Sequence, residues 1–226
     1  MPTLVPTCRS RFKRCRSPFA KRIGVFGFRL IILLLAATDG ASLNADCAPQ
    51  WESGHTSPGP NSIDSTVTCL GTWDPDGAGP QPTRLVMGGG FSTVGDVGAS
   101  NIATWNGTGC SALGSGLSIG PPAAITVYNN QLIVGGNFTD AGGQPSTSRI
   151  ARWTSQSGWG QLGGGLNSPV YALSTYNGQL IAGGTFTMVI GGISVNRIAQ
   201  WNGVSWSSLG QGVNGDVRAL AVYNGE

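Results

Sequence analysis

The chain has 226 residues and a formal net charge of +3, but its positive charge is concentrated at its beginning. Eight of its 13 lysines and arginines lie in the first 45 residues, against one acid. The rest carries five arginines, no lysine and nine acidic residues, which gives a net charge near −4. Because phosphate binding needs clustered lysine or arginine, this composition argues against nucleic acid as a partner.

The first 45 residues have the layout of a secretory signal peptide. A basic stretch precedes the apolar core at 30–37 (LIILLLAA), and small residues follow up to Ala45, after which we predict cleavage. A membrane anchor is the weaker alternative, since spanning a bilayer takes about 20 apolar residues. We therefore expect an exported protein, secreted or at the cell surface, with no stable membrane insertion after cleavage.

Residues 46–66 are predicted to be an irregular lead-in. They are rich in proline, glycine and serine and show no periodicity. A short strand near Trp51 is the one element we expect there. We interpret His55, the only histidine of the chain, as an exposed linker residue rather than a ligand or a base.

Removal of the leader leaves three cysteines, Cys47, Cys69 and Cys110. Disulfides are possible in an exported chain, but three is an odd number, so their pairing stays open. Cys69 and Cys110 fall at repeat positions that other copies fill with alanine and tryptophan, respectively. We interpret them as buried thiols in core positions, and no spacing fits a zinc site.

The remaining chain is a repeat with a period of about 48 residues. Three aromatic markers return at spacings of 47 or 48 residues, namely Trp105, Trp153 and Trp201; Phe91, Phe138 and Phe186; and Tyr128, Tyr176 and Tyr223. A period of about 40 to 50 residues is typical of propellers and similar arrays.

Each repeat predicts four short β-strands, and the first two form a hairpin. The first strand, at 170–176 and at 219–223 in the last copy, alternates small and larger residues. It ends at a pair such as Asn177-Gly178, which favours a tight turn. The second strand is predicted at three equivalent places, 85–92 (LVMGGGFS), 132–139 (LIVGGNFT) and 180–187 (LIAGGTFT).

The paired glycines of the second strand indicate close approach of another backbone or a large ring. A nucleotide-binding glycine loop is the rival interpretation. It fails because phenylalanine and threonine follow these glycines, without a helix or a Gly-Lys pair.

The third strand is predicted to begin at Asn101, Arg149 and Arg197 in the three copies, and a fourth strand follows, as at 206–212 (WSSLGQG). Leu113, Leu162 and Leu209 lie in register in the fourth strands. No sustained helical period occurs after residue 45. The sequence therefore predicts an all-β fold, best matched by a β-propeller of four-stranded blades.

The repeat resembles known families. A Gly-Gly pair followed about 17 residues later by tryptophan is similar to the blades of kelch-type and galactose-oxidase-type propellers. The string VYNGQLIAGGTFT…RIAQWNGVSWSSLGQG more closely resembles repeats of large exported bacterial propeller proteins and of fungal cell-surface polarity markers. The resemblance covers 67–226 and implies a fold, but names no function. The first copy departs from it through an insertion at 74–82 and through Cys110.

Three complete units are expected, at 67–117, 123–166 and 169–213, followed by the first strand of a fourth. A closed propeller takes four to eight blades. We therefore expect 67–226 to be a partial propeller. A fragment of a longer protein is favoured over a ring completed by another chain.

No residue is assigned to catalysis, to a cofactor or to a metal. Acid–base chemistry needs titratable groups brought together, and the copper site of the galactose-oxidase resemblance uses more histidines than this chain has. We interpret the recurring aromatic residues as interblade core and the recurring arginines, Arg149 and Arg197, as structural donors. Asp74 and Asp76 lack the full ligand set of a calcium loop, and the loop acids Asp96, Asp140 and Asp216 are taken as solvated.

The leading prediction is an exported, non-catalytic propeller protein that binds a protein or glycan partner, or serves as a structural surface component. The loops at 93–100, 140–148 and 188–196 are expected to line the binding face. The alternative is a carbohydrate-active or oxidase-type propeller enzyme whose catalytic residues lie in blades missing from this chain. The ligand-binding residues stay unassigned.

Overall fold

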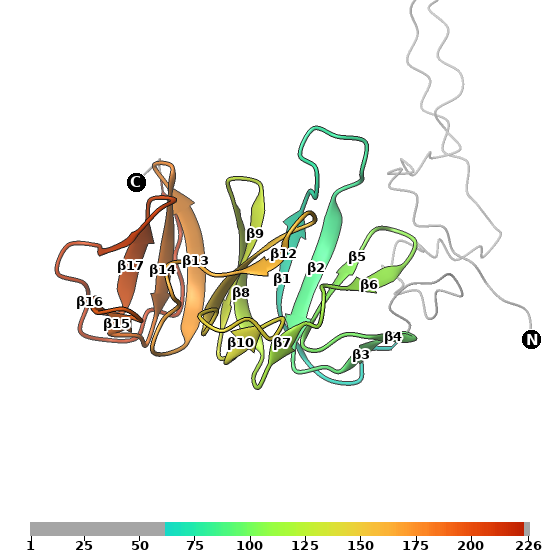
Figure 1. Cartoon of the computed structure of the whole chain (residues 1–226), viewed down its shortest axis with the longest axis horizontal. Coiled ribbons are helices and arrows are strands. Elements are labelled where there is room, and N and C mark those ends of the chain that lie inside the picture. The colour runs from blue at the N-terminus through green and yellow to red at the C-terminus, as the bar shows by residue number, and fades with distance from the viewer. Residues whose placement is uncertain (1–61, 224–226) are drawn as a thin grey trace, which may run out of the picture. The chain divides into compact units, whose positions relative to one another are not determined.

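The computed structural model describes residues 62–223, and these residues form an all-β fold (Figure 1). Within this range there is no helix, and the strands form three four-stranded and three two-stranded antiparallel sheets, none of them closed into a ring. The predicted signal peptide, His55, Cys47 and the strand near Trp51 lie outside the described residues.

The three four-stranded sheets have the same strand order. In each sheet the four strands lie side by side in the order in which they occur along the chain. We call them the first, second and third units. The first unit consists of β1 (Val67–Trp73), β2 (Arg84–Gly89), β5 (Ile102–Trp105) and β6 (Cys110–Ala112). The second consists of β8 (Pro122–Tyr128), β9 (Gln131–Gly136), β11 (Ile150–Thr154) and β12 (Gly158–Gly160). The third consists of β13 (Val170–Tyr176), β14 (Gln179–Gly184), β17 (Ile198–Trp201) and β18 (Trp206–Ser208). The four-stranded repeat is thus confirmed.

The predicted hairpin turns are present. Asn129 and Asn130 join β8 to β9 with φ of 49° and 60°, and Asn177 and Gly178 join β13 to β14 with φ of 46° and 71°. Two consecutive left-handed residues make the turn whose twist matches that of the flanking strands. Asparagine and glycine occupy these positions because they adopt positive φ at low cost.

Three predicted strand boundaries are wrong. The second strands end at the paired glycines rather than three residues later; Asn137 N, for example, donates at 3.0 Å to Pro121 O, which precedes the start of β8. The fourth strands end before Leu113, Leu162 and Leu209, because the carbonyl of each leucine accepts from the glycine N–H three residues later and so begins a turn. The third strands begin one residue late, because Asn101, Arg149 and Arg197 have φ of 65°, 67° and 61°. These left-handed residues cannot belong to an extended strand.

Three two-stranded pairs were not predicted. They are β3 (Thr93–Val94) with β4 (Val97–Gly98), β7 (Leu117–Ser118) with β10 (Asp140–Ala141), and β15 (Met188–Val189) with β16 (Ile193–Ser194). Strands of two residues are too short to show periodicity in a sequence. The pair of β7 and β10 joins the end of the first unit to the second.

The units pack in chain order, with the first strands β1, β8 and β13 side by side (Figure 1). The sheets stack face to face, so that a buried cluster lies between each sheet and the next. The buried cluster between the first two units includes Val86, Ile102, Leu132, Val134 and Trp159. The cluster between the second and third includes Ile133, Ile150, Leu180, Ala182 and Trp206. The predicted interunit aromatic core is confirmed for four of the recurring aromatic residues, which lie in these clusters: Phe138 in the first, and Tyr128, Phe186 and Trp201 in the second.

The paired glycines mark close approaches, as predicted. A Cβ on Gly135 would lie 2.6 Å from Cγ1 of Val170 in the next unit. A Cβ on its neighbour Gly136 would lie 2.6 Å from both Pro121 O and Pro122 Cα, which precede and begin the first strand of the same sheet. The first glycine therefore accommodates a side chain of the next unit, and the second accommodates backbone.

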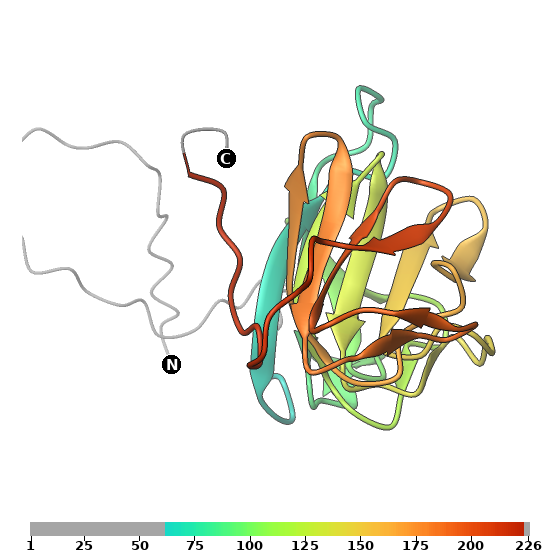
Figure 2. The same ribbon diagram turned by 90° about the vertical axis from the view of Figure 1, so that its left-hand side faces the viewer.

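The predicted strand at 219–223 is absent from the structure. The segment instead extends away from β18 along the third unit (Figure 2), and Val217 N donates to Gly184 O at 3.1 Å. Tyr223 is 77% exposed, so its predicted core position is wrong as well. The reason is that no other described strand pairs with this segment.

Candidate interaction surface

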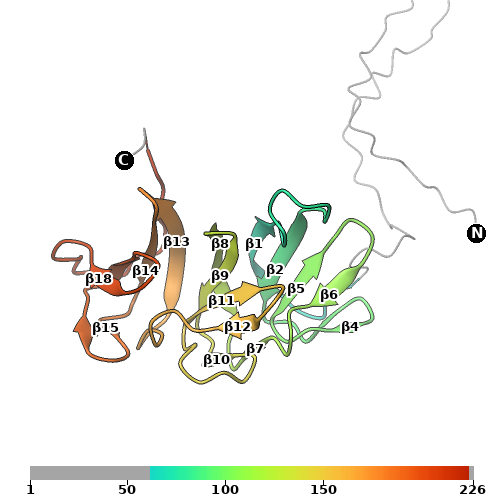
Figure 3. The same cartoon turned by 45° about the horizontal axis from the view of Figure 1, so that its top comes forward.

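The three predicted loops lie at the same end of their sheets, at the lower side of Figures 1 and 3. We call 93–100, 140–148 and 188–196 together the loop edge. Each of these loops connects the second strand of its unit to the third. Because each unit repeats the same strand order, equivalent loops return to the same end.

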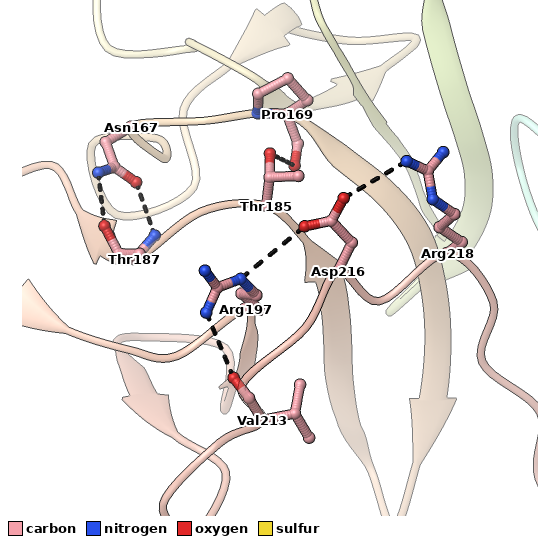
Figure 4. Close-up of polar contacts among 8 residues, drawn as sticks. All are labelled: Asn167, Pro169, Thr185, Thr187, Arg197, Val213, Asp216 and Arg218. Carbon is pink, nitrogen blue, oxygen red and sulfur yellow. Dashed lines mark hydrogen bonds and ion pairs between the residues drawn. The ribbon is translucent and has the colours of Figure 1, made fainter.

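Each loop is fastened by a polar residue that precedes the first strand of its unit. In the third unit, Asn167 Oδ1 accepts from Thr187 N at 3.0 Å, and Asn167 Nδ2 donates to Thr187 Oγ1 at 3.1 Å (Figure 4). Asn167 Oδ1 also accepts from Met188 N at 3.1 Å. In the second unit, Thr139 N donates to Ser118 O at 2.9 Å, and Ser118 Oγ donates to Asp140 Oδ1 at 3.0 Å.

Asp64 holds the first loop by accepting hydrogen bonds from loop amides, as Asn167 does in the third unit. Its carboxylate accepts from Ser92 N at 2.9 Å, from Thr93 N at 3.1 Å and from the Ser92 hydroxyl. The hydroxyl bond, followed by the Thr93 amide bond, holds the pKa of Asp64 below its ordinary value of 3.8. These fastening residues were not predicted, although each is a polar residue three or four positions before a first strand.

The Asp64 contact predicts a pH dependence of stability. Because the folded pKa is lowered, the stabilisation is fully present above pH 3.8 and is lost as the pH falls through the folded pKa. We expect the urea midpoint of the wild type to exceed that of Asp64→Asn above this value, and the difference to shrink below it. Paired urea titrations across this range measure the effect. A difference that stays constant as the solution is acidified would show that the carboxylate charge is not involved.

The exposed side chains of the loop edge differ from one unit to the next. The third loop exposes three apolar side chains, with Met188 at 42%, Ile190 at 45% and Ile193 at 42%. The second loop exposes the polar sequence Gly143 to Ser146, and the first exposes Asp96. The apolar run MVIGGI was visible in the sequence, but only its placement on an exposed hairpin distinguishes it from core.

The recurring arginines have structural partners. Arg149 Nη1 donates to Asn137 Oδ1 at 2.7 Å and to the Asn137 carbonyl. Arg197 Nε lies 3.9 Å from Asp216 Oδ1, and its Nη1 lies 3.5 Å from Val213 O (Figure 4). Both arginines therefore donate hydrogen bonds to backbone carbonyls next to the loop edge.

Asp216 lies between two guanidinium groups, since Arg218 Nη2 approaches its Oδ2 at 3.4 Å (Figure 4). Asp216 is an exposed loop acid, as interpreted from the sequence, but it also has two ion-pair partners. Asp140 likewise accepts from Ser118 and from Gly143 N at 3.0 Å. Both carboxylates position loop backbone or neighbouring side chains.

Asp74 and Asp76 shape the inserted loop of the first unit. Asp74 Oδ1 accepts from Asp76 N at 3.2 Å, and Asp76 Oδ2 accepts from Gln81 N at 3.1 Å. Within 62–223, no three His, Cys, Asp or Glu side chains gather as a metal site would require. A polar cavity of about 240 Å³ lies beside this loop, between Asp76, Asn130 and Gln156.

Cys69 and Cys110 form no disulfide, and both are partly buried thiols. Burial raises the pKa of Cys69 from 9.0 to about 11, offset in part by a hydrogen bond with Thr68. Burial also raises the pKa of Cys110.

The reactivity of Cys69 should follow its pKa, because the thiolate is the reacting species. At pH 9 we expect iodoacetamide to modify Cys69 about 50-fold more slowly in the folded chain than in urea, because the rise in pKa from 9.0 to about 11 lowers the thiolate fraction by that factor. Peptide mass spectrometry over time measures both cysteines in one sample. Equal rates for Cys69 with and without urea would show that its position in the fold is wrong.

Among the described residues, no helix is long and apolar enough to cross a membrane. Comparison with known proteins adds no relative, since no family model, no curated protein and no solved structure matches the chain.

Proposed function

We propose that this protein is an exported, non-catalytic β-repeat module that binds a protein or glycan partner through its loop edge. Its units would be blades of a propeller. The 48-residue period, the identical four-stranded construction and the adjacency of β1, β8 and β13 support that architecture. The basic and apolar leader supports export.

One observation carries the proposal. Each loop of the loop edge is held by hydrogen bonds to a residue that precedes its unit, whereas the exposed side chains differ from loop to loop. Asp64 and Asn167 hold equivalent loops with equivalent bonds from two loop amides to one side chain. Ser118 holds the second loop through its carbonyl and its hydroxyl. The exposed side chains on those loops, by contrast, change from charged to small and polar to apolar. Rigid scaffolds that carry variable loops are a common way of building recognition surfaces.

The disposition of the charged groups favours binding over catalysis. The carboxylates of Asp64, Asp140 and Asp216 are all used as acceptors for nearby loop groups or as ion-pair partners. Catalytic proton transfer instead requires a titratable group that can reach a substrate. The apolar tip of the third loop suits contact with a partner surface, because clustered exposed apolar side chains often mark interfaces.

Site-specific photocrosslinking in the producing cells tests the proposal. A photoreactive amino acid replaces Ile190 at the loop edge, and a matched variant carries it at Val204, an 84% exposed apolar residue in the turn after β17. That turn lies at the opposite end of the strand from the loop edge. We expect a discrete adduct from position 190 and none from position 204.

The mass shift of the adduct tells a protein partner from a glycan. Adducts of equal yield at both positions, or none at 190 in correctly exported protein, would contradict binding at the loop edge.

A further inference from the structure

The third unit has a sheet face that forms an apolar groove. The groove has a volume of about 250 Å³, and its large apolar lining residues are Tyr176, Ile181, Ile198, Leu209, Leu220 and Val222. The first four residues come from the third unit, and the last two come from the segment after β18. This face is separate from the loop edge, which is formed by the connections between the second and third strands.

The same residues of the second unit form a buried interface. The counterparts of Tyr176, Ile181, Ile198 and Leu209 are Tyr128, Ile133, Ile150 and Leu162. The largest difference in exposure is at the leucines, since Leu162 is 2% exposed and Leu209 is 37% exposed, whereas Ile133 and Ile181 are both buried. The difference arises because the third unit covers this face of the second unit. Among the described residues, only 217–222 lies against the same face of the third unit.

The covering surface has a defined chemistry. The third unit covers the second with Leu180 and Ala182 of β14, Trp201 of β17 and Trp206 of β18. Trp206 also donates its indole N–H to the carbonyl of Leu162 at 2.9 Å. A partner for the groove would therefore present one leucine, one small residue and two indoles on the face of a β-sheet.

The segment at 217–222 already occupies the place of a first strand. Val217 packs over Gly183, just as Val170 packs over Gly135 between the second and third units. In the two preceding units, the strand in this place pairs with a second strand, as β13 pairs with β14. Within the described residues, the segment at 217–222 has no such strand beside it.

We propose that this groove binds a β-meander of the same repeat type. Its second strand pairs with 217–222, and its leucine, small residue and two tryptophans cover Ile181, Ile198 and Leu209. The occupant follows from continuity with the two interfaces inside the chain, where the same surface chemistry is already satisfied twice. The inference does not depend on binding at the loop edge.

The test uses the full chain and a synthetic peptide that copies residues 177–213, labelled with a fluorophore. This peptide contains the strands that cover the second unit. Fluorescence anisotropy should show saturable binding. Ile198→Asp in the protein should weaken binding at least tenfold, since the substitution places a carboxylate in the groove. Val204→Asp, the same kind of change on an exposed turn, should leave binding unchanged.

A second variant covers the case in which Ile198→Asp does not fold, as judged by circular dichroism. Leu180→Asp in the peptide should then abolish binding to the wild-type chain. No saturable binding at millimolar peptide, or binding that both substitutions leave intact, would overturn the proposal. A dimer of the chain that Ile198→Asp dissociates, without peptide binding, would show that a surface other than such a meander covers the groove and would also overturn the proposal. Crosslinking at Ile190 is unaffected by any of these outcomes.

Discussion

Replacing Phe138 with alanine is expected to lower the free energy of unfolding by about 3–5 kcal/mol. Phe138 is fully buried, and it packs with Leu117 of the first unit and with Ala141 of its own loop. Its removal leaves a cavity that the surrounding sheets cannot fill. Since domains are stable by only about 5–15 kcal/mol, urea titration should show a large fall in the midpoint.

A conservative change at the same position provides the control. Phe138→Leu keeps an apolar side chain in the cluster, so it should cost less than half as much as the alanine change. A Phe138→Ala protein with a wild-type midpoint would mean that the recurring phenylalanines are not core residues. The same substitution at Phe186, which is also fully buried, should have an effect of similar size.

Gly136→Ala is expected to destabilise the chain by about 3 kcal/mol, at the upper end of the usual cost of overpacking. The added Cβ would lie 2.6 Å from Pro121 O and Pro122 Cα. Both are backbone atoms at the start of β8, so relief requires movement of the strand itself. The change should appear as a lower urea midpoint.

Gly98→Ala is the matched control for this substitution. Gly98 is exposed in β4, and a Cβ there would meet no atom within 4 Å. Its stability should stay within about 0.5 kcal/mol of the wild type, as is usual for surface substitutions. Equal effects at the two glycines would refute the close approach at Gly136.

Much of the fold could be predicted because the repeat shows three residues at each equivalent position, one in each copy. The aromatic period located the units, and the Asn-Asn and Asn-Gly pairs located the hairpin turns. The recurrence of paired glycines indicated close packing, which Gly135 and Gly136 show directly. In each case a local chemical property determines the structure.

The features that could not be predicted depend on contacts distant in sequence. β7 and β10 pair across 22 residues, and Asp64 reaches Ser92 across 28. Neither contact has a local pattern. The left-handed Arg149 is another example, because its side chain bonds to Asn137 and its backbone N–H bonds to Phe138 O, contacts that a sequence does not display.

The predicted strand at 219–223 shows the limit of repeat-based reasoning. Its sequence matches the other first strands, but a strand needs a hydrogen-bonded neighbour as well as a suitable sequence. Among the described residues none is adjacent. Sequence specifies the capacity to pair, and the presence of a partner decides whether the strand forms.

Both proposals rest on the claim that one interface is built repeatedly along this chain. Trp159 Nε1 donates to Leu113 O, and Trp206 Nε1 donates to Leu162 O, each at 2.9 Å in a buried setting. Replacing either tryptophan by phenylalanine keeps a ring but leaves a buried carbonyl without its donor, at a cost of about 1–3 kcal/mol.

The most direct test is therefore to measure the urea unfolding free energies of Trp159→Phe and Trp206→Phe side by side. The account predicts a loss of about 1–3 kcal/mol in both variants. A loss at one position and wild-type stability at the other would show that the two interfaces are not equivalent.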